Sequence, residues 1–311
     1  MSPPARVRPR AVPRGGVLGV CAPSGPVQAE RLVTGLDGLR AIGFDVALAP
    51  GLLEREGFLA GTDAVRARDM AAFLRDPGID GLVCARGGYG AMRILPLLDD
   101  ESWAARAKPL VGFSDITALH QLLACQGVVS FHGTVLESPE GGQPAPNLAT
   151  LASALTSLAP LGAMAWPADG PTPVCLYPGR ASGPLVGGNL SLLAATMGTP
   201  WELRCEGCLL LLEDVGEPPY TIDRYLTQLA LGGHLGAAAG FVVGELVDCG
   251  RPEDAPTARE VVAERLASLG KPCLANLPLG HGRYKLTVPL GVRAELDATA
   301  GSLTFVEPAL A

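Results

Sequence analysis

The sequence lacks the features that mark proteins acting on membranes or nucleic acids. Charged residues make up only 18% of its 311 residues, and the net charge of −7 favours no polyanionic partner. No apolar run reaches the roughly 18 residues that a membrane-spanning helix needs, and the first 14 residues have no apolar signal-peptide core. The sequence therefore predicts a cytoplasmic protein with no nucleic-acid partner and no membrane partner.

Metal and cofactor motifs are also scarce. Cys205 and Cys208 form a single Cys-x-x-Cys pair with no second pair and no histidine near them in the sequence, whereas a structural zinc needs four ligands. Neither a Gly-x-Gly-x-x-Gly nor a phosphate-binding lysine follows the first predicted strand, residues 16–22. The sequence predicts neither a metal nor a cofactor, which disfavours a cofactor-dependent α/β enzyme.

What the chain does have is an alternation of short apolar runs with helical periodicity. Nearly half of the residues are apolar, enough for a large buried core. The alternation predicts an α/β fold whose first half is a doubly wound parallel sheet. The predicted strands of this half are residues 16–22, 44–48, 81–85, 109–112 and 128–131.

Composition divides the chain into four parts. Residues 1–14 hold four arginines and four prolines and are predicted to be a disordered basic tail. Residues 15–140 form the predicted N-terminal domain, and residues 141–183, rich in Gly, Pro, Ala and Thr, the connection between domains. Residues 184–311 form the predicted C-terminal domain, which ends in short strands between 284 and 306.

The most informative stretch is residues 109–117, Pro-Leu-Val-Gly-Phe-Ser-Asp-Ile-Thr. An apolar run reads as a buried strand, and Gly112 permits a tight turn before a helical pattern. A serine on such a strand-to-helix turn displays its hydroxyl above the sheet, so Ser114 is a candidate nucleophile. The alternative is that Ser114 or Asp115 only caps the helix.

A second loop follows the predicted strand 81–85. Arg86 is followed by Gly-Gly-Tyr-Gly, and glycines let backbone N–H groups approach a ligand closely. This loop is a candidate oxyanion donor, with Arg86 available to a substrate carboxylate; the alternative is an ordinary tight turn. Both loops follow parallel strands, whose carboxyl ends share the edge where ligands bind.

A serine nucleophile needs a base and an acid that orients it. His281 lies between two glycines after an apolar strand, which predicts an exposed ring that can act as a base. His132 follows a strand and could line the site. Glu213 ends an apolar run and could orient the imidazole, or pair with Arg224 instead. Glu217 is the rival acid.

Together these motifs resemble those of the LD-carboxypeptidases (muramoyltetrapeptide carboxypeptidases), and the resemblance runs from about residue 16 to 306. The motifs that carry it occur in the following order: residues 86–90 (Arg-Gly-Gly-Tyr-Gly), 111–117 (Val-Gly-Phe-Ser-Asp-Ile-Thr), 187–190 (Gly-Gly-Asn-Leu), 212–217 (Leu-Glu-Asp-Val-Gly-Glu) with Tyr220 and Asp223-Arg224, and 280–282 (Gly-His-Gly). Position 116 is Ile, so the serine motif is not Gly-x-Ser-x-Gly.

The resemblance implies a catalytic triad of Ser114, Glu213 and His281, with an oxyanion hole made by the backbone N–H groups of Gly88 and Asp115. It implies a flavodoxin-like nucleophile domain and a smaller, β-rich C-terminal α/β domain that supplies acid and base. The implied reaction removes the terminal D-alanine from murein tetrapeptide in cell-wall recycling, without a metal. A homodimer is also expected from the family.

Two substrate-binding residues are suggested by position and chemistry: Arg86, for the free carboxylate, and Asn189, which could instead cap its own helix. Other functions remain open at this point. A microcin-immunity-type peptidase would share the triad and cleave a peptidyl-nucleotide. A non-enzymatic module with two α/β domains could bind a small ligand without using Ser114 at all.

Overall fold

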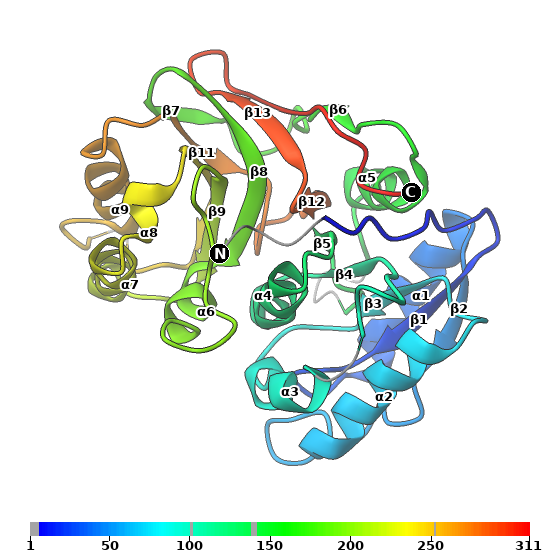
Figure 1. Ribbon diagram of the computed structural model, residues 1–311. Helices are drawn as coiled ribbons and strands as arrows, with labels where there is room; N and C mark the ends of the chain where they lie inside the picture. Colours follow the sequence, from blue (N-terminus) through cyan, green and yellow to red (C-terminus); the bar gives the residue numbers. More distant parts are fainter. Residues whose placement is uncertain (1–5, 100–101, 138–141, 252) are drawn as a thin grey trace. The chain divides into compact units, whose positions relative to one another are not determined.

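The computed structural model describes residues 6–99, 102–137, 142–251 and 253–311 (Figure 1). The chain divides into two compact units. Unit 1 comprises Met1–Ala159, Leu286–Gly291 and Ala309–Ala311, and unit 2 comprises Pro160–Lys285 and Val292–Pro308. Each unit is built on a sheet of its own and is described separately below.

Unit 1 is built on a six-stranded sheet in the order β12-β5-β4-β3-β1-β2. All neighbouring strands are parallel except β12, which is antiparallel to β5. Its elements in chain order are β1 (Val17–Cys21), α1 (Ala29–Ala41), β2 (Asp45–Leu48), α2 (Asp63–Arg75), β3 (Gly81–Cys84), α3 (Ala91–Leu98), β4 (Leu110–Gly112), η1 (Ser114–Ile116), α4 (Thr117–Cys125), β5 (Ser130–His132), α5 (Ala145–Thr156) and β12 (Val288–Leu290).

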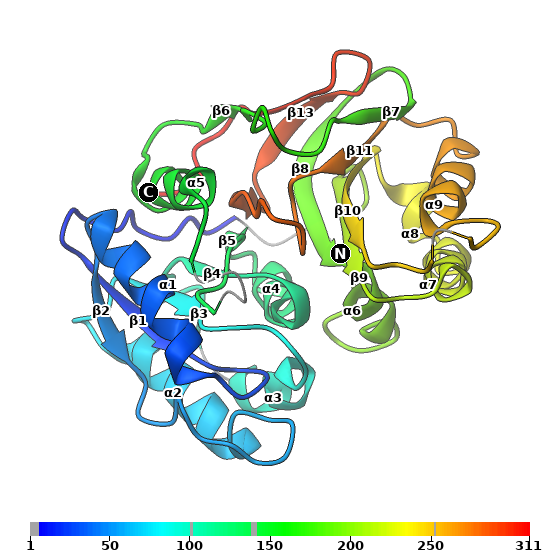
Figure 2. The ribbon, with the colours of Figure 1, turned by 180° about the vertical axis from the view of Figure 1, so that it is seen from behind.

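Helices cover both faces of this sheet. From one side α2, α3 and α4 lie in front of the strands, and from the opposite side α1 and α5 do (Figures 1 and 2). Because both faces are covered, the central strands are continuous apolar runs, and every residue of β3 and β4 is buried. The predicted doubly wound parallel sheet is confirmed.

The carboxyl ends of three neighbouring strands bring three loops to one edge of the sheet. Cys21 at the end of β1 pairs with Cys84 at the end of β3, and Val83 pairs with Val111 of β4. The chain therefore leaves the same edge into residues 22–28, 85–90 and 113–116. This edge is where parallel α/β sheets bind ligands.

Unit 2 is built on an eight-stranded sheet in the order β6-β14-β13-β8-β9-β10-β11-β7. The four strands β8 to β11 are parallel, with antiparallel strands on either side. Its elements are β6 (Gly162–Ala163), β7 (Val174–Tyr177), β8 (Arg180–Asn189), α6 (Leu190–Ala195), β9 (Leu209–Val215), α7 (Pro219–Leu231), α8 (His234–Ala237), β10 (Gly240–Val247), α9 (Ala258–Ala267), β11 (Cys273–Leu277), β13 (Arg293–Asp297) and β14 (Ser302–Phe305).

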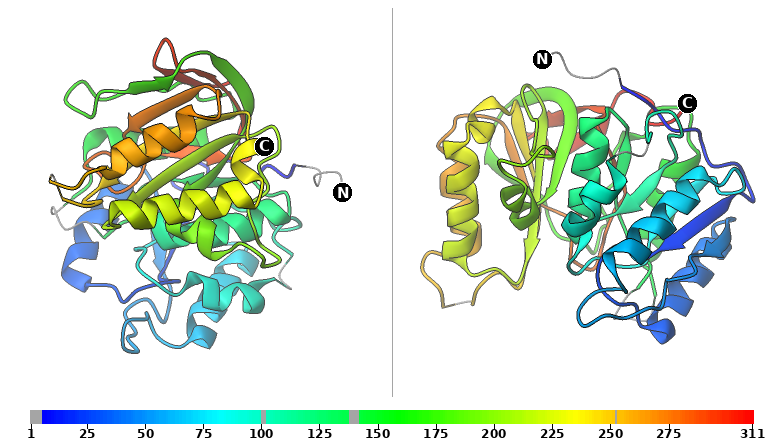
Figure 3. Two further views of the ribbon diagram at one scale, coloured as in Figure 1. Left: turned by 90° about the vertical axis from the view of Figure 1, so that its left-hand side faces the viewer. Right: turned by 60° about the horizontal axis from the view of Figure 1, so that its bottom comes forward.

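The core of unit 2 lies between this sheet and its helices. Helices α7 and α9 lie side by side in front of the strands (Figure 3, left). Leu210 and Leu212 of β9 are buried in the same apolar cluster as Leu226 of α7 and Val262 of α9. The leucine run of β9 is therefore the centre of this unit, and Glu213 follows it within the same strand. Among the described residues, no helix combines the length and apolar character needed to cross a bilayer.

The division into units differs from the expected boundaries 15–140, 141–183 and 184–311. The expected connection contains α5, which belongs to unit 1, while β6 and β7 belong to unit 2. Strand β12 returns to unit 1 from within the expected C-terminal domain, because Val288 and Leu290 pair with β5 and bury their side chains there. Residues 138–141, which span the predicted boundary, lie outside the described residues.

The described part of the expected disordered tail, residues 6–14, is packed against unit 1. Val7 forms a bridge with Val128, its N–H donating to the Gly127 carbonyl at 2.8 Å. Val12 is buried, and its N–H donates to Leu155 at 2.8 Å. Two valines therefore anchor a segment that its arginines and prolines would otherwise leave solvated. Residues 1–5 lie outside the described residues.

The placement of β12 can be tested by truncating Val288. We expect Val288→Ala to destabilise unit 1 by about 2 kcal/mol, because it empties a fully buried site. Urea unfolding followed by the fluorescence of Trp103, which is buried in unit 1, measures this in a Trp166→Phe/Trp201→Phe background. The half-exposed Val306 of unit 2 provides the control, since Val306→Ala should leave this transition unchanged. An unchanged Trp103 transition in Val288→Ala would contradict the assignment.

Candidate active site

The backbone at Ser114 has the geometry of a displayed nucleophile. Strand β4 ends at Gly112, and Ser114 opens the short helix η1 with φ +65°, in the left-handed region. Few residues other than glycine adopt this region, and those that do cluster at functional sites because they are strained. The predicted strand-to-helix turn is present, and it places Ser114 at the ligand-binding edge of the sheet.

Gly112 is needed for a reason different from the predicted tight turn. It is an extended strand residue, paired with His132 of β5. A Cβ there would lie 2.8–2.9 Å from the Ile116 side chain. Glycine therefore lets η1 fold back closely over the end of β4, and the sharp turn itself is made at Ser114.

Each glycine of the loop 86–90 meets a separate requirement. A Cβ on Gly87 would lie 2.8 Å from Ser114 Cβ and 3.0 Å from its Oγ, so this loop passes directly against the serine. Gly88 has φ +114° and lies against Gly25, whose N–H donates to the Gly87 carbonyl at 3.1 Å. Gly90 has φ +126°, and a side chain there would meet Arg66.

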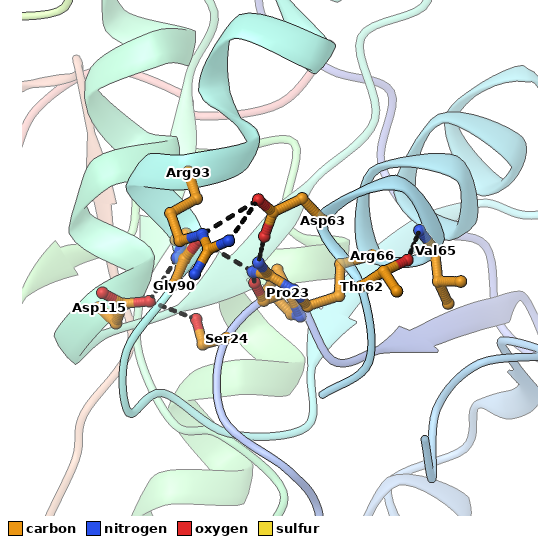
Figure 4. Close-up of polar contacts among 10 residues, drawn as sticks. Pro23, Ser24, Thr62, Asp63, Val65, Arg66, Gly90, Arg93 and Asp115 are labelled. Atoms are coloured by element: carbon orange, nitrogen blue, oxygen red, sulfur yellow. Dashed lines mark hydrogen bonds and ion pairs between the residues drawn. The ribbon is translucent and has the colours of Figure 1, made fainter. Parts of the chain in front are cut away.

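The carboxylate of Asp115 joins the three loops at this edge. It is buried, and its Oδ2 accepts hydrogen bonds from Ser24 Oγ at 2.6 Å and from the Ala91 N–H at 2.7 Å (Figure 4). Ser24 lies in the loop after β1, and Ala91 is the first residue of α3. The side chain of Asp115 therefore has a structural task beside the predicted role of its N–H group.

Arg86, the candidate for a substrate carboxylate, contacts the loop after β1. Its Nη1 donates to the Pro26 carbonyl at 2.9 Å and lies 3.5 Å from Glu137 Oε1. The other oxygen of Glu137 accepts from the Gln28 N–H at 3.1 Å. The guanidinium thus braces this loop, with one third of its side chain exposed to solvent.

Unit 2 brings the predicted acid and base together. His281 Nδ1 lies 2.7 Å from Glu213 Oε2, and the glutamate side chain is fully buried at the carboxyl half of β9. An ionised carboxylate only accepts hydrogen bonds, so the imidazole donates through Nδ1 and Nε2 is the atom able to take a proton. The ring is 16% exposed, less than the sequence predicted, because it packs against Glu213.

The two glycines beside His281 each lie against a carboxylate. Gly280 has φ +127°, and a side chain there would clash with Glu213. A side chain at Gly282 would clash with Glu245 of β10. Burial raises the pKa of Glu245, although nearby Lys285 and Arg259 oppose this. The Gly-His-Gly motif therefore allows the turn to fit closely over the ends of β9 and β10.

Glu217, the rival acid, and Asn189, the candidate substrate-binding residue, contact other groups of the protein. Glu217 Oε1 lies 3.4 Å from the Tyr225 hydroxyl. Asn189 caps α6: its Oδ1 accepts from the Leu192 N–H at 3.2 Å, and its Nδ2 donates to Asp214 at 3.0 Å. Burial raises the pKa of Asp214 to about 6. The cap that the sequence left open for Asn189 is present.

The remaining histidines have partners of other kinds. His120 is buried in α4 between Ser130 Oγ and the Gly112 carbonyl, each 2.9 Å from a ring nitrogen. His132, which could line the site, is the last residue of β5 rather than the residue after it; its side chain is buried and edge-on to Phe113. His234 Nδ1 lies 4.0 Å from Cys205 Sγ.

Arg66 is an important residue of this site that the sequence motifs did not indicate. Arg66 is buried in α2, where it hydrogen-bonds the Pro23 and Gly90 carbonyls and pairs with Asp63 (Figure 4). Its position offered a signal. Residues 66, 70 and 74 repeat at the spacing of one helix face, and Met70 and Leu74 make that face apolar. An arginine on such a face needs internal partners.

Comparison with known proteins identifies the family. The N-terminal domain of the LD-carboxypeptidases (peptidase family S66) matches residues 18–133, and the C-terminal domain matches residues 182–296. This chain belongs to the LD-carboxypeptidase family. A putative carboxypeptidase of Streptomyces coelicolor in this family is 45% identical, covering 98% of this chain and 97% of its own.

Two further relatives have more specific names. The murein tetrapeptide carboxypeptidase of Pseudomonas aeruginosa is 34% identical over 92% of this chain and 94% of its own. The microcin C7 self-immunity protein MccF of Escherichia coli is 26% identical over 98% and 97%. A structure of MccF with glutamyl sulfamoyl guanosine has a TM-score of 0.90 and covers 98% of this chain and 100% of that one, at 22% identity. This chain is thus similar both to a murein tetrapeptide carboxypeptidase and to a microcin self-immunity protein.

Because His120 is buried, we expect the free energy of unfolding of unit 1 to depend on pH. Burial lowers the pKa of His120 from 6.5 to about 4, so below pH 6.5 the unfolded chain takes up a proton that the folded chain does not. Stability is therefore lost as the pH falls from 6.5 towards 4. At pH 5 the loss should be about 2 kcal/mol relative to pH 8.

The His120→Gln variant tests this by removing the titrating group. Urea unfolding at pH 8 and pH 5, followed by Trp103 fluorescence in the background described above, gives the change in unfolding free energy. We expect the variant to lose about 2 kcal/mol less than the parent on this change of pH. An equal loss in both proteins would show that His120 does not carry the effect.

Proposed function

We propose that this chain is a serine carboxypeptidase that removes the terminal D-alanine from murein tetrapeptide, in cell-wall recycling. One observation carries the proposal: the imidazole of His281 is held by the buried Glu213 at 2.7 Å, in a family member whose Ser114 has a strained, left-handed backbone. Ser114 is the nucleophile, His281 the base and Glu213 the orienting acid. The name of the P. aeruginosa relative supports this choice of substrate.

The reaction proceeds through an acyl-enzyme. His281 Nε2 takes the Ser114 proton as Oγ attacks the carbonyl carbon of the L,D peptide bond. The backbone N–H groups of Gly88 and Asp115 stabilise the oxyanion that forms on the carbonyl oxygen. His281 then gives the proton to the D-alanine nitrogen, the C–N bond breaks, and D-alanine leaves. Water, deprotonated by His281, hydrolyses the ester and restores Ser114.

The two candidate acids and the two candidate substrate-binding residues have different places in this proposal. Glu213 accepts from Nδ1 and stabilises the imidazolium that forms when Ser114 is deprotonated. Glu217 contacts Tyr225 and is not assigned to the triad. Arg86 remains the candidate for the terminal carboxylate of the substrate, whereas the amide of Asn189 is engaged in capping α6. The protein is further proposed to act as a cytoplasmic homodimer, as the family resemblance implies.

The alternative substrate is a peptidyl-nucleotide. MccF has been solved with glutamyl sulfamoyl guanosine, so a relative of the same fold binds such a compound. The same three residues would perform this cleavage, and the choice would depend on substrate contacts outside the triad. Assaying D-alanine release from the tetrapeptide beside cleavage of a peptidyl-nucleotide distinguishes the two, and we expect the tetrapeptide to have the higher kcat/KM.

The mechanism predicts how the triad variants behave. We expect Ser114→Ala and His281→Ala to abolish D-alanine release, and Glu213→Gln to lower kcat by about 10⁴-fold, since the amide favours the wrong imidazole tautomer. Glu217→Gln is the matched control and should retain most of the activity. The wild-type rate should be unchanged by EDTA. Full activity in Ser114→Ala would exclude an acyl-enzyme on this residue, and the nucleophile would then have to be another group.

The close approach of Gly87 to Ser114 predicts that adding a side chain at position 87 lowers activity. We expect Gly87→Ala to lower kcat by up to about 100-fold, because the new methyl group would displace the serine from its attacking position. Gly236→Ala is the control, since a Cβ there meets nothing within 4 Å. Circular dichroism and thermal unfolding establish that both variants fold. Wild-type kcat in Gly87→Ala would show that this close approach does not matter.

A further inference from the structure

The strongest feature that the proposed triad leaves unused is the buried Arg66. Its Nη1 donates to two backbone carbonyls, those of Pro23 and Gly90, the latter at 2.8 Å. Its Nη2 pairs with Asp63, which also binds Arg93 at 2.9 Å. Figure 4 shows these contacts converging from α2, α3 and the loop after β1. A buried guanidinium with this many partners fixes the positions of the groups it binds.

Arg66 and Asp115 hold the same peptide group from opposite ends. The peptide that joins Gly90 to Ala91 accepts a hydrogen bond from Arg66 through its carbonyl and donates one to Asp115 through its N–H, at 2.8 and 2.7 Å. A cation at the oxygen and an anion at the hydrogen both align with the peptide dipole. Charge-assisted bonds of this kind are shorter and stronger than neutral ones, so the orientation of this peptide is firmly set.

Two adjacent residues at the start of the loop after β1 are held by the same pair of side chains. Arg66 binds the Pro23 carbonyl, and the hydroxyl of the next residue, Ser24, donates to Asp115 at 2.6 Å. Arg66 and Asp115 therefore hold both loops between them. The side chains of both residues are buried, which shields these contacts from water and salt.

This arrangement bears on the proposed oxyanion hole. One donor, the Gly88 N–H, lies two residues before Gly90; the other is the backbone N–H of Asp115 itself. Asp115 carries one donor, and its carboxylate binds the Ala91 N–H, at the end of the loop that carries the other donor, Gly88. Fixing the Gly90–Ala91 peptide therefore restrains the distance between the Gly88 and Asp115 N–H groups.

We propose that Arg66 is a positioning residue for the oxyanion hole, acting through the Gly90–Ala91 peptide together with the Asp115 carboxylate. Arg66 does not touch the substrate. It keeps the Gly88 and Asp115 N–H groups at the spacing that the oxyanion requires. The proposal rests on the proposed serine mechanism. It fits the close packing at Gly90, where φ is +126° and a Cβ would lie 2.6 Å from Leu59 Cδ2 and 2.9 Å from Arg66 Nη1.

Misplaced oxyanion donors weaken transition-state binding more than substrate binding. We therefore expect Arg66→Met to lower kcat by about 10- to 100-fold and to change KM by less than about threefold. Arg66→Lys should lie between Arg66→Met and the wild type, because one ammonium cannot reproduce the planar fork. Arg68→Met is the matched control: Arg68 lies in the same helix, its side chain is 56% exposed and it pairs with Asp69.

The decisive measurement is the rate at which a fluorophosphonate probe modifies Ser114, measured beside steady-state D-alanine release. The probe transfers its phosphonyl group to the serine oxygen while the P–F bond breaks, fluoride leaves and His281 takes the serine proton. The phosphonyl oxygen, on which negative charge develops in the transition state, occupies the oxyanion hole. Arg66→Met should slow both reactions by a similar factor while Arg68→Met slows neither. Combining Arg66→Met with Asp115→Asn should cost less than the product of the separate losses, because both hold one peptide.

Several results would overturn the proposal. One is a folded Arg66→Met protein that reacts with the probe at the wild-type rate; another is a loss confined to KM. If Arg66→Met fails to fold, Arg66→Lys and Ser24→Ala carry the test, and wild-type rates in both would contradict it. A wild-type protein that reacts with the probe but releases no D-alanine would refute the proposed substrate, and the probe rates would still test Arg66.

Discussion

The buried carboxylate of Asp115 makes the contacts on which the Ser114 end of unit 1 depends. One oxygen binds Ser24 after β1 and the Ala91 N–H at the start of α3, so three consecutive strand ends share one acceptor. Neighbouring Ser114 adopts a strained left-handed backbone that isolated chains avoid. Such strain persists only where the surrounding structure over-determines it. The Asp115 contacts, the Arg66 contacts and the close approach of Gly87 together provide that constraint.

In unit 2, too, a buried carboxylate fixes the position of a neighbouring group. Glu213 follows the leucine run of β9, so the most buried strand of the unit places its carboxylate. Because an unpaired buried carboxylate is costly, its 2.7 Å contact with His281 both gives Glu213 a hydrogen-bond partner and orients the imidazole. Glycines on either side of the histidine let the turn approach Glu213 and Glu245. In both units, rigid strand ends supply position, and glycines supply the close approach.

The residues that could be predicted from the sequence are those whose signals are local. Ser114 and Glu213 each follow an apolar run, and His281 lies in a glycine turn, so a few neighbouring residues suffice to find them. Arg66 and the Asp115 carboxylate act on partners 24 to 91 residues away, which no local pattern reveals. Similarly, alternation predicted strands after residue 284 but could not tell that β12 joins the sheet of unit 1. The basic composition of residues 6–14 predicted disorder, but Val7 and Val12 hold this segment against unit 1.

The central claim, that Ser114 attacks the substrate, can be tested by trapping the intermediate. Wild-type protein mixed with murein tetrapeptide and quenched in acid within milliseconds is examined by intact-mass spectrometry and peptide mapping. The proposed mechanism predicts a covalent adduct on Ser114 with the mass of the tripeptide acyl group that remains after D-alanine leaves. This adduct should decay as the free tripeptide appears. D-alanine release without any adduct on Ser114, even at the earliest times and under conditions that slow deacylation, would contradict it.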